Sequence, residues 1–128
     1  MNAINWFDLP ATDIDRAIQF YSTILDKPVK KDEFNGMPHG IFPSDASGVG
    51  GALVLSPNHV PADDRGAIIY LNVGDLDGIL SRVEGAGGRV ILPKKAIPPQ
   101  GFIAWIRDSE GNRVGLHQPP AEGIVPTY

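Results

Sequence analysis

The sequence has no cysteine among its 128 residues, which excludes disulfide bonds, zinc–thiolate sites, iron–sulfur clusters and cysteine nucleophiles. It has no uncharged apolar run close to the roughly 20 residues that a membrane span needs. Positive charge is not in excess either, because the net charge is −4 and the isoelectric point is about 5.2. We therefore expect neither nucleic acid nor a membrane as a partner.

The first 20 residues also lack a basic stretch followed by an apolar stretch, which is the pattern of a secretory signal. A cytoplasmic location is therefore expected. The chain contains 15 glycines and 12 prolines, but they are spread along its length and separate apolar segments, which indicates many turns rather than disorder. The length suits a single domain that covers residues 1–128.

The two halves of the chain resemble each other. A shift of 62 residues without a gap places Leu9 on Leu71 and the segment 13–15 on the segment 75–77. The same shift aligns four further pairs, which are Ile18 with Leu80, Ile41 with Ile103, Ser47 with Ser109 and Pro57 with Pro119. One shift that holds over most of both halves indicates an internal repeat.

Each half predicts the same order of elements. β-branched and aromatic residues predict a first strand at 4–9 and at 67–73. An acidic residue then lies in the first turn of a predicted amphipathic helix, at Asp15 and at Asp77. Shorter strands are expected at 39–43 and 50–56 in the first half, and at 89–92, 102–107 and 113–118 in the second.

This pattern predicts an α+β fold made of two tandem βαβββ modules. We expect module 1 at about 3–57, a linker at about 57–66, module 2 at about 67–118 and a tail at 119–128. A small sheet cannot bury both of its faces alone, so the modules should associate through their concave sheet faces and enclose a cavity.

Two stretches carry a resemblance to a known family. Residues 9–21 (LPATDIDRAIQFY) are similar to the strand-to-helix entry of the vicinal oxygen chelate superfamily, and residues 107–116 (RDSEGNRVGL) are similar to its C-terminal hairpin. This superfamily groups glyoxalase I, bleomycin-resistance proteins and extradiol dioxygenases. The resemblance implies paired βαβββ modules and a homodimer, but one fold hosts many activities.

In the metal-using members of this superfamily, the first and last strands of each module supply the ligands. The matching positions here are Trp6, Leu53, Ile68 and Gly115, and none of these side chains can bind a divalent cation. The resemblance therefore implies that the metal site of the family is missing. We expect no cofactor and no divalent metal ion, and neither glyoxalase I nor dioxygenase activity.

Alternation along strands predicts which residues line the cavity, because residues two apart share one face. The wall should be partly apolar, as small-molecule sites usually are, with Trp6 as a stacking surface and with room left by Gly115. Leu55 would also belong to this wall, and Arg113 to its polar minority. The predicted ligand-binding residues are Trp6, Asp8, Leu53, Ile68, Tyr70, Asn72, Gly115 and His117.

Two functions remain open from the sequence. The first is a metal-free protein that binds a small organic molecule in the cavity. The second is a lyase or isomerase in which Asp8 or His117 acts as an acid–base catalyst or as a displaced metal ligand. Either residue can instead be a structural partner of a backbone group, while His39 and His59 lie in loops where a surface position is expected.

Overall fold

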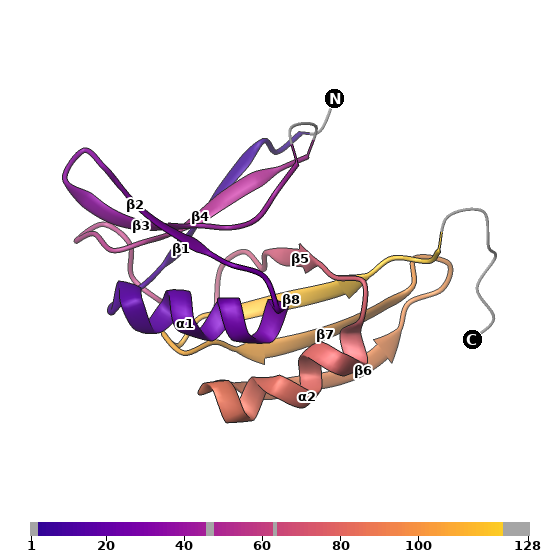
Figure 1. The fold of residues 1–128 in the computed structure, drawn as a ribbon. Coiled ribbons are helices and arrows are strands. Elements are labelled where there is room, and N and C mark those ends of the chain that lie inside the picture. The colour runs from indigo at the N-terminus through magenta and orange to yellow at the C-terminus, as the bar shows by residue number, and fades with distance from the viewer. Residues whose placement is uncertain (1–2, 46–47, 63, 122–128) are drawn as a thin grey trace.

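The computed structural model describes residues 3–45, 48–62 and 64–121, and the predicted tail falls mostly outside these residues. The chain is an α+β protein built from two βαβββ modules (Figure 1). Module 1 contains β1 (Trp6–Pro10), α1 (Ile14–Leu25), β2 (Lys30–Phe34), β3 (Met37–Ile41) and β4 (Gly50–Val54). Module 2 contains β5 (Tyr70–Asn72), α2 (Leu76–Ala86), β6 (Arg89–Ala96), β7 (Phe102–Arg107) and β8 (Arg113–Gln118).

Each module forms its own four-stranded sheet. Sheet A has the strand order β1-β4-β3-β2, and sheet B has the matching order β5-β8-β7-β6. The first strand of each module runs parallel to the last strand, while the other neighbours are antiparallel. The predicted architecture of two tandem βαβββ modules is therefore confirmed. Among the described residues, neither helix has the length and apolar character that crossing a bilayer requires.

Both helices begin and end at residues suited to those positions. The carboxylates of Asp13 and Asp75 accept a hydrogen bond from the backbone N–H three residues later, which is typical of an N-cap. The ends of α1 and α2 are closed by Asp26 and Gly87 in the left-handed conformation. The expected helix starts, in the same place in each module, are confirmed.

The strand β2 was not expected from the sequence. All five of its residues are exposed, so its pattern shows no apolar alternation. It forms because Asn35 and Gly36, both with positive φ, make a tight turn that pairs β2 with β3. The Asn-Gly pair was therefore the only local signal of this hairpin.

The repeat does not keep one shift over its full length. The helices and first strands follow the expected shift, but Leu9 pairs with Leu53, whereas Leu71 pairs with Leu116. The shift that relates the last strands, β4 and β8, is thus one residue larger than the shift that relates the first strands, β1 and β5. The expectation of a repeat without a gap is wrong beyond the helices, and this matters because one residue reverses the face on which a side chain lies.

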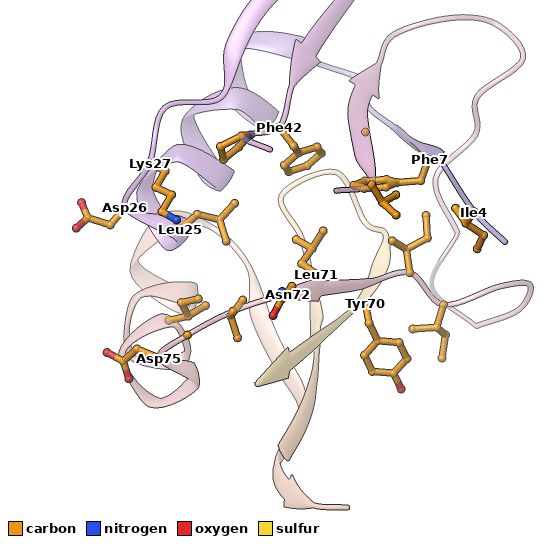
Figure 2. Close-up of a pocket in the computed structure, with 18 of the residues that line it drawn as sticks. Ile4, Phe7, Leu25, Asp26, Lys27, Phe42, Tyr70, Leu71, Asn72 and Asp75 are labelled. Atoms are coloured by element: carbon orange, nitrogen blue, oxygen red, sulfur yellow. The ribbon is translucent and has the colours of Figure 1, made fainter. Parts of the chain in front are cut away.

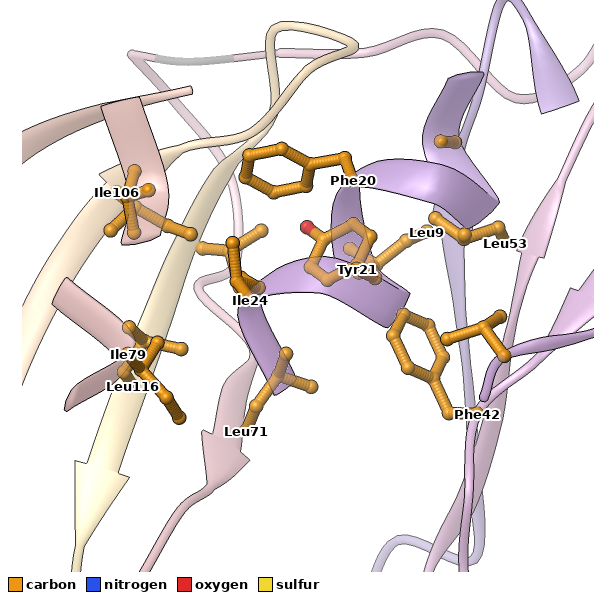
Figure 3. Close-up of a cluster of buried hydrophobic side chains, with 14 of the residues drawn as sticks. Leu9, Phe20, Tyr21, Ile24, Phe42, Leu53, Leu71, Ile79, Ile106 and Leu116 are labelled. Carbon is orange, nitrogen blue, oxygen red and sulfur yellow. The ribbon is translucent and has the colours of Figure 1, made fainter. Parts of the chain in front are cut away.

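The modules associate through their helices. In Figure 3, Phe20, Tyr21 and Ile24 of α1 lie between Leu53 of sheet A on one side and Leu116 of sheet B on the other. All five side chains belong to one buried cluster. The expectation that the modules associate through their concave sheet faces is wrong within this chain, because the wide apolar surface of α1 packs against both modules. The face of each sheet opposite its helix, here named the open face, points away from this core.

Candidate functional site

A groove of about 930 Å³ lies between the two modules (Figure 2). Phe7 and Phe42, whose ring centroids are 5.5 Å apart, line it from module 1. Leu71 and Tyr70 line it from β5. Charged side chains, including Lys27, gather at the opposite end from Tyr70. The volume and the largely apolar lining are typical of a site for a small organic molecule.

Three of the predicted ligand-binding residues line this groove, namely Ile68, Tyr70 and Asn72. Tyr70 and Asn72 lie on the same face of β5 because Leu71, between them, points into the core. The other predicted residues lie outside the groove, on the open faces or in the core.

Trp6 and Asp8 lie together on the open face of sheet A, as the alternation predicted. The Trp6 indole N–H donates to Oδ1 of Asp8 at 3.0 Å, and Nε2 of His59 lies 3.0 Å from Oδ2. Nδ1 of the same imidazole lies 2.5 Å from the Ser56 hydroxyl. If this hydroxyl donates to Nδ1, the Nε2–H of His59 faces the carboxylate. His59 therefore contacts a candidate catalytic residue, contrary to the expectation of a plain surface loop.

Leu53 does not lie beside Trp6. Trp6 pairs with Gly50, so Ala52 and Val54 share the Trp6 face and Leu53 points to the other side of sheet A. Its side chain is buried in the core. The expectation that Leu53 and Trp6 belong to one wall is therefore wrong, because the repeat was aligned one residue away from the true pairing.

Gly115 lies under the ring of Tyr70. The two residues are paired across β5 and β8, and a Cβ atom added at Gly115 would overlap this ring. The Tyr70 hydroxyl accepts a hydrogen bond of 2.7 Å from the indole N–H of Trp105 on β7. The room expected at Gly115 is thus filled by Tyr70. Trp105 was missed, although it directly opposes Gly115 in the strand pairing.

His117 and Asp8, the two catalytic candidates, belong to different sheets. Nε2 of His117 lies 2.6 Å from the carbonyl oxygen of Gln100, which is the structural role left open by the sequence. Asn72 is its neighbour on β5. The structure thus gives each candidate its own partner and does not bring the two together.

The residues that stand at the metal-ligand positions of the superfamily do not fit a metal ion. Trp6, Leu53, Ile68 and Gly115 offer no side-chain nitrogen or oxygen that binds a cation, and Leu53 lies on the opposite face of its sheet from Trp6. In the described ranges, no three His, Asp or Glu residues are grouped so that they could hold a metal ion.

The two stretches that carry the family resemblance meet at one corner between the modules. Both oxygens of Glu110, in the turn between β7 and β8, are hydrogen bonded there. Oε1 accepts the backbone N–H groups of Thr12 and Asp13 at 2.8 Å each, and Oε2 accepts from Nε of Arg16 at 2.8 Å. Burial alone would raise the pKa of Glu110, but the bonds from Arg16 and these N–H groups lower it to about 2.

A second carboxylate is buried at the same corner. Oδ2 of Asp108 accepts from the Tyr21 hydroxyl at 2.6 Å and from the Asn112 amide at 2.9 Å. Burial raises the pKa of both Asp108 and Tyr21. The Asn112 amide also donates to the carbonyl oxygen of Pro10 in module 1 at 2.7 Å. The residues of the corner therefore join the modules rather than lining a cavity.

Comparisons with known proteins agree with this architecture. A family model described as the Glyoxalase/Bleomycin resistance protein/Dioxygenase superfamily matches residues 3–116. "Putative glyoxylase CFP32" of Mycobacterium bovis is 28% identical over 119 residues, which cover 89% of this chain but 44% of that protein. The chain thus spans less than half the length of this relative. A "Glyoxylase-like domain-containing protein" of Didymella fabae is 30% identical over 123 residues, covering 85% of this chain and 88% of that one.

Solved structures show the same fold. A glyoxalase/bleomycin resistance protein from Albidiferax ferrireducens T118 superposes with a TM-score of 0.69 at 16% identity, covering 93% of this chain and 100% of that one. TnmS3, an antibiotic binding protein from Streptomyces sp. CB03234, has a TM-score of 0.67 at 23% identity, covering 94% and 98%. At these identities the likeness concerns the fold alone.

Proposed function

Because this chain belongs to the Glyoxalase/Bleomycin resistance protein/Dioxygenase superfamily, we propose that it binds a small, partly apolar organic molecule in the groove between its modules, without a metal ion. The observation that carries the proposal is the groove of about 930 Å³ with aromatic side chains, Phe7 and Phe42 on one side and Tyr70 on the other. A similar fold in TnmS3 belongs to an antibiotic binding protein.

The lining of the groove explains the kind of molecule that we propose. Phe7, Phe42 and Leu71 favour a ligand with apolar or aromatic surface, because removing such surface from water is favourable. Asn72 and Lys27 are among the polar groups of the lining that would orient it. This division of roles is usual in sites that bind organic molecules.

A ligand screen by thermal shift, with and without divalent metal ions, tests the proposal. A bulky side chain at the groove margin, Val49→Trp, should weaken every hit at least tenfold, because Val49 lines the groove. Val60→Trp is the matched control, since Val60 is exposed and lies outside the groove lining. Saturable stabilisation that is independent of metal and lost only in Val49→Trp supports binding in the groove. Equal affinity in both variants would place the ligand elsewhere.

We further propose that the protein is a homodimer in which a second copy covers the open faces. Trp6 and Tyr70 are 48% and 42% exposed on these faces, which is unusual for large aromatic side chains. The strands β1 and β5 each have one neighbour among the described residues. Light scattering should give about twice the 13.7 kDa of one chain, and Trp6→Glu should lower this mass. A monomer at micromolar concentration would contradict the proposal.

A second candidate function is a lyase or isomerase, and the contacts of Asp8 favour it. Asp8 holds Nε2 of His59 while Ser56 lies at Nδ1, the kind of arrangement in which a carboxylate orients a histidine for proton transfer. Turnover assays on each ligand hit decide the matter. If a ligand is converted to product, and Asp8→Asn and His59→Gln each abolish this turnover while His39→Gln preserves it, the protein is an enzyme rather than a binding protein.

A further inference from the structure

The described lining of the groove is charged at one end only. Figure 2 shows charged side chains at the end opposite Tyr70. The guanidinium of Arg82 belongs to this end because it contacts the carbonyl oxygen of Ile24 in the last turn of α1. The four charged residues of the lining belong to the helices or to the residues next to them, away from the open faces, and are Asp26, Lys27, Asp75 and Arg82.

The two acidic side chains of this end point away from the groove. In Figure 2 the carboxylates of Asp26 and Asp75 are directed outwards, and both residues are exposed. Oδ1 of Asp75 also accepts the backbone N–H of Gly78 at 3.0 Å, as the N-cap of α2. The negative charge at this end therefore faces solvent, and half of it already serves the helix.

The two basic side chains of this end have no acidic partner in the described ranges. Neither Lys27 nor Arg82 forms an ion pair there. Nε and Nη2 of Arg82 donate to the carbonyl oxygen of Ile24 at 3.2 and 2.9 Å, which holds the guanidinium at the negative end of the α1 dipole. Its Nη1 has no protein acceptor within residues 3–45, 48–62 and 64–121. Positive charge is thus what this end of the groove offers to a ligand.

Apolar side chains begin directly beside this cationic end. In Figure 2 the Lys27 ammonium lies beside Leu25, and Phe42 and Leu71 come next in the direction of Phe7. An ion bound against apolar side chains is partly shielded from water, which strengthens its attraction to a nearby cation. The groove therefore suits a molecule with a charged head and an apolar body.

We infer that the groove takes an amphiphilic carboxylate, whose headgroup binds Lys27 and Arg82 and whose apolar body packs on Phe42 and Phe7. The inference rests on the proposed function and names its ligand class. A single negative charge suits this end better than a phosphate dianion, because part of the Arg82 guanidinium is already bound to Ile24. The competing ligand is an organic amine, which would be attracted by the acidic side chains of the same end.

Three ligands with one apolar body test the inference by isothermal titration calorimetry on the full chain. They are 3-(2-naphthyl)propanoate, the neutral 3-(2-naphthyl)propanamide and the cationic 3-(2-naphthyl)propylamine. We expect the carboxylate to bind about tenfold more tightly than the amide, because its hydrogen bonds are charge-assisted. The amine should bind most weakly. High salt should reduce the preference for the carboxylate, since Lys27 is exposed.

Substitutions then locate the headgroup. Lys27→Gln should reduce the preference for the carboxylate about threefold or more and leave the affinity for the amide unchanged, whereas Lys27→Arg keeps the charge and should keep the preference. Lys30→Gln is the matched control, because Lys30 is exposed on β2 and lies outside the groove lining. Val49→Trp should weaken the binding of all three ligands, because it narrows the groove itself. Thermal unfolding midpoints check that each variant is folded.

Each contrary result has a distinct meaning. Equal affinity for the three ligands, with all three weakened in Val49→Trp, overturns the anionic headgroup and leaves the proposed function in place. A preference for the carboxylate that Lys27→Gln does not change overturns the inference as well, and so does tightest binding of the amine. Binding that Val49→Trp does not weaken overturns both the inference and the proposed site. If none of the three ligands binds, the inference is wrong, while the ligand screen described above still decides the proposed function.

Discussion

The two modules approach each other at two places that the internal repeat relates, yet one place is sealed and the other is open. At the sealed corner, Glu110 of module 2 binds the N-terminus of α1 in module 1. At the equivalent place, Pro43 and Val49, which lie between β3 and β4, line the groove together with Asp75 at the N-terminus of α2. The backbone N–H of Leu76 donates instead to Gln118 of its own module. There the groove remains, bordered by Pro43, Val49 and Asp75.

The residues of the sealed corner have a structural role, whereas the residues of the groove are candidates for a functional role. The corner uses buried carboxylates that are all hydrogen bonded, which fixes the relative position of the modules. The groove presents aromatic and aliphatic side chains at one end and charged side chains at the other. A chain that had sealed both places would have had no cavity at this interface. The break in the repeat is therefore what leaves the groove open.

Removing the carboxylate at the centre of the corner should have the largest effect. Asp108→Ala leaves the buried Tyr21 hydroxyl and the backbone N–H of Asn112 without their acceptor, which should lower the free energy of unfolding by about 3 kcal/mol. Urea denaturation followed by circular dichroism measures it. The matched control is Asp64→Ala, whose side chain is exposed and makes only an exposed ion pair with Arg65, so that the loss should stay below about 0.5 kcal/mol. Similar losses in both variants would mean that the buried hydrogen bonds of Asp108 contribute no more to stability than an exposed carboxylate does.

The corner should also make stability depend on pH. The pKa of Glu110 is about 2 in the folded protein, against 4.5 for the free side chain. Its contribution is therefore complete above pH 4.5 and disappears as the pH falls towards 2. Asp108, with a raised pKa, acts in the opposite direction, so the effect must be isolated with Glu110→Gln.

Between pH 6 and pH 3, the wild type should lose about 1 kcal/mol more than Glu110→Gln, a figure reduced for screening because Arg16 is half exposed. Urea denaturation at both pH values gives the difference. Parallel losses in the two proteins would show that Glu110 is not charged and bound as the structure indicates.

Sequence patterns predicted the modules because the relevant signals are local. The caps Asp13 and Asp75, and the spacing of apolar residues in the helices, depend only on near neighbours. These local signals could not predict which residues pack against each face of the two sheets. The face on which Leu53 lies was predicted wrongly, because an alignment error of one residue moves every side chain of a strand to the other face of the sheet. His59 was missed because its partner Asp8 is 51 residues away.

The smallest effect is expected from a substitution that places a carboxylate at the N-terminus of α2, as Glu110 does at the N-terminus of α1. Gln118 already accepts the N–H of Leu76 at the start of α2, as Glu110 does for α1. Gln118→Glu keeps an oxygen acceptor and adds a negative charge at a helix N-terminus, which should raise the free energy of unfolding by about 0.5 kcal/mol. Gln118→Ala removes the acceptor and should lower it by about as much. Thermal unfolding at low salt resolves the two signs, and ligand binding in the groove should stay unchanged because Gln118 is not part of its lining. A loss of stability in Gln118→Glu would mean that Asp75, which already caps α2, repels a second acid there. The corner on α1 would then tolerate its acid only because Arg16 binds Glu110.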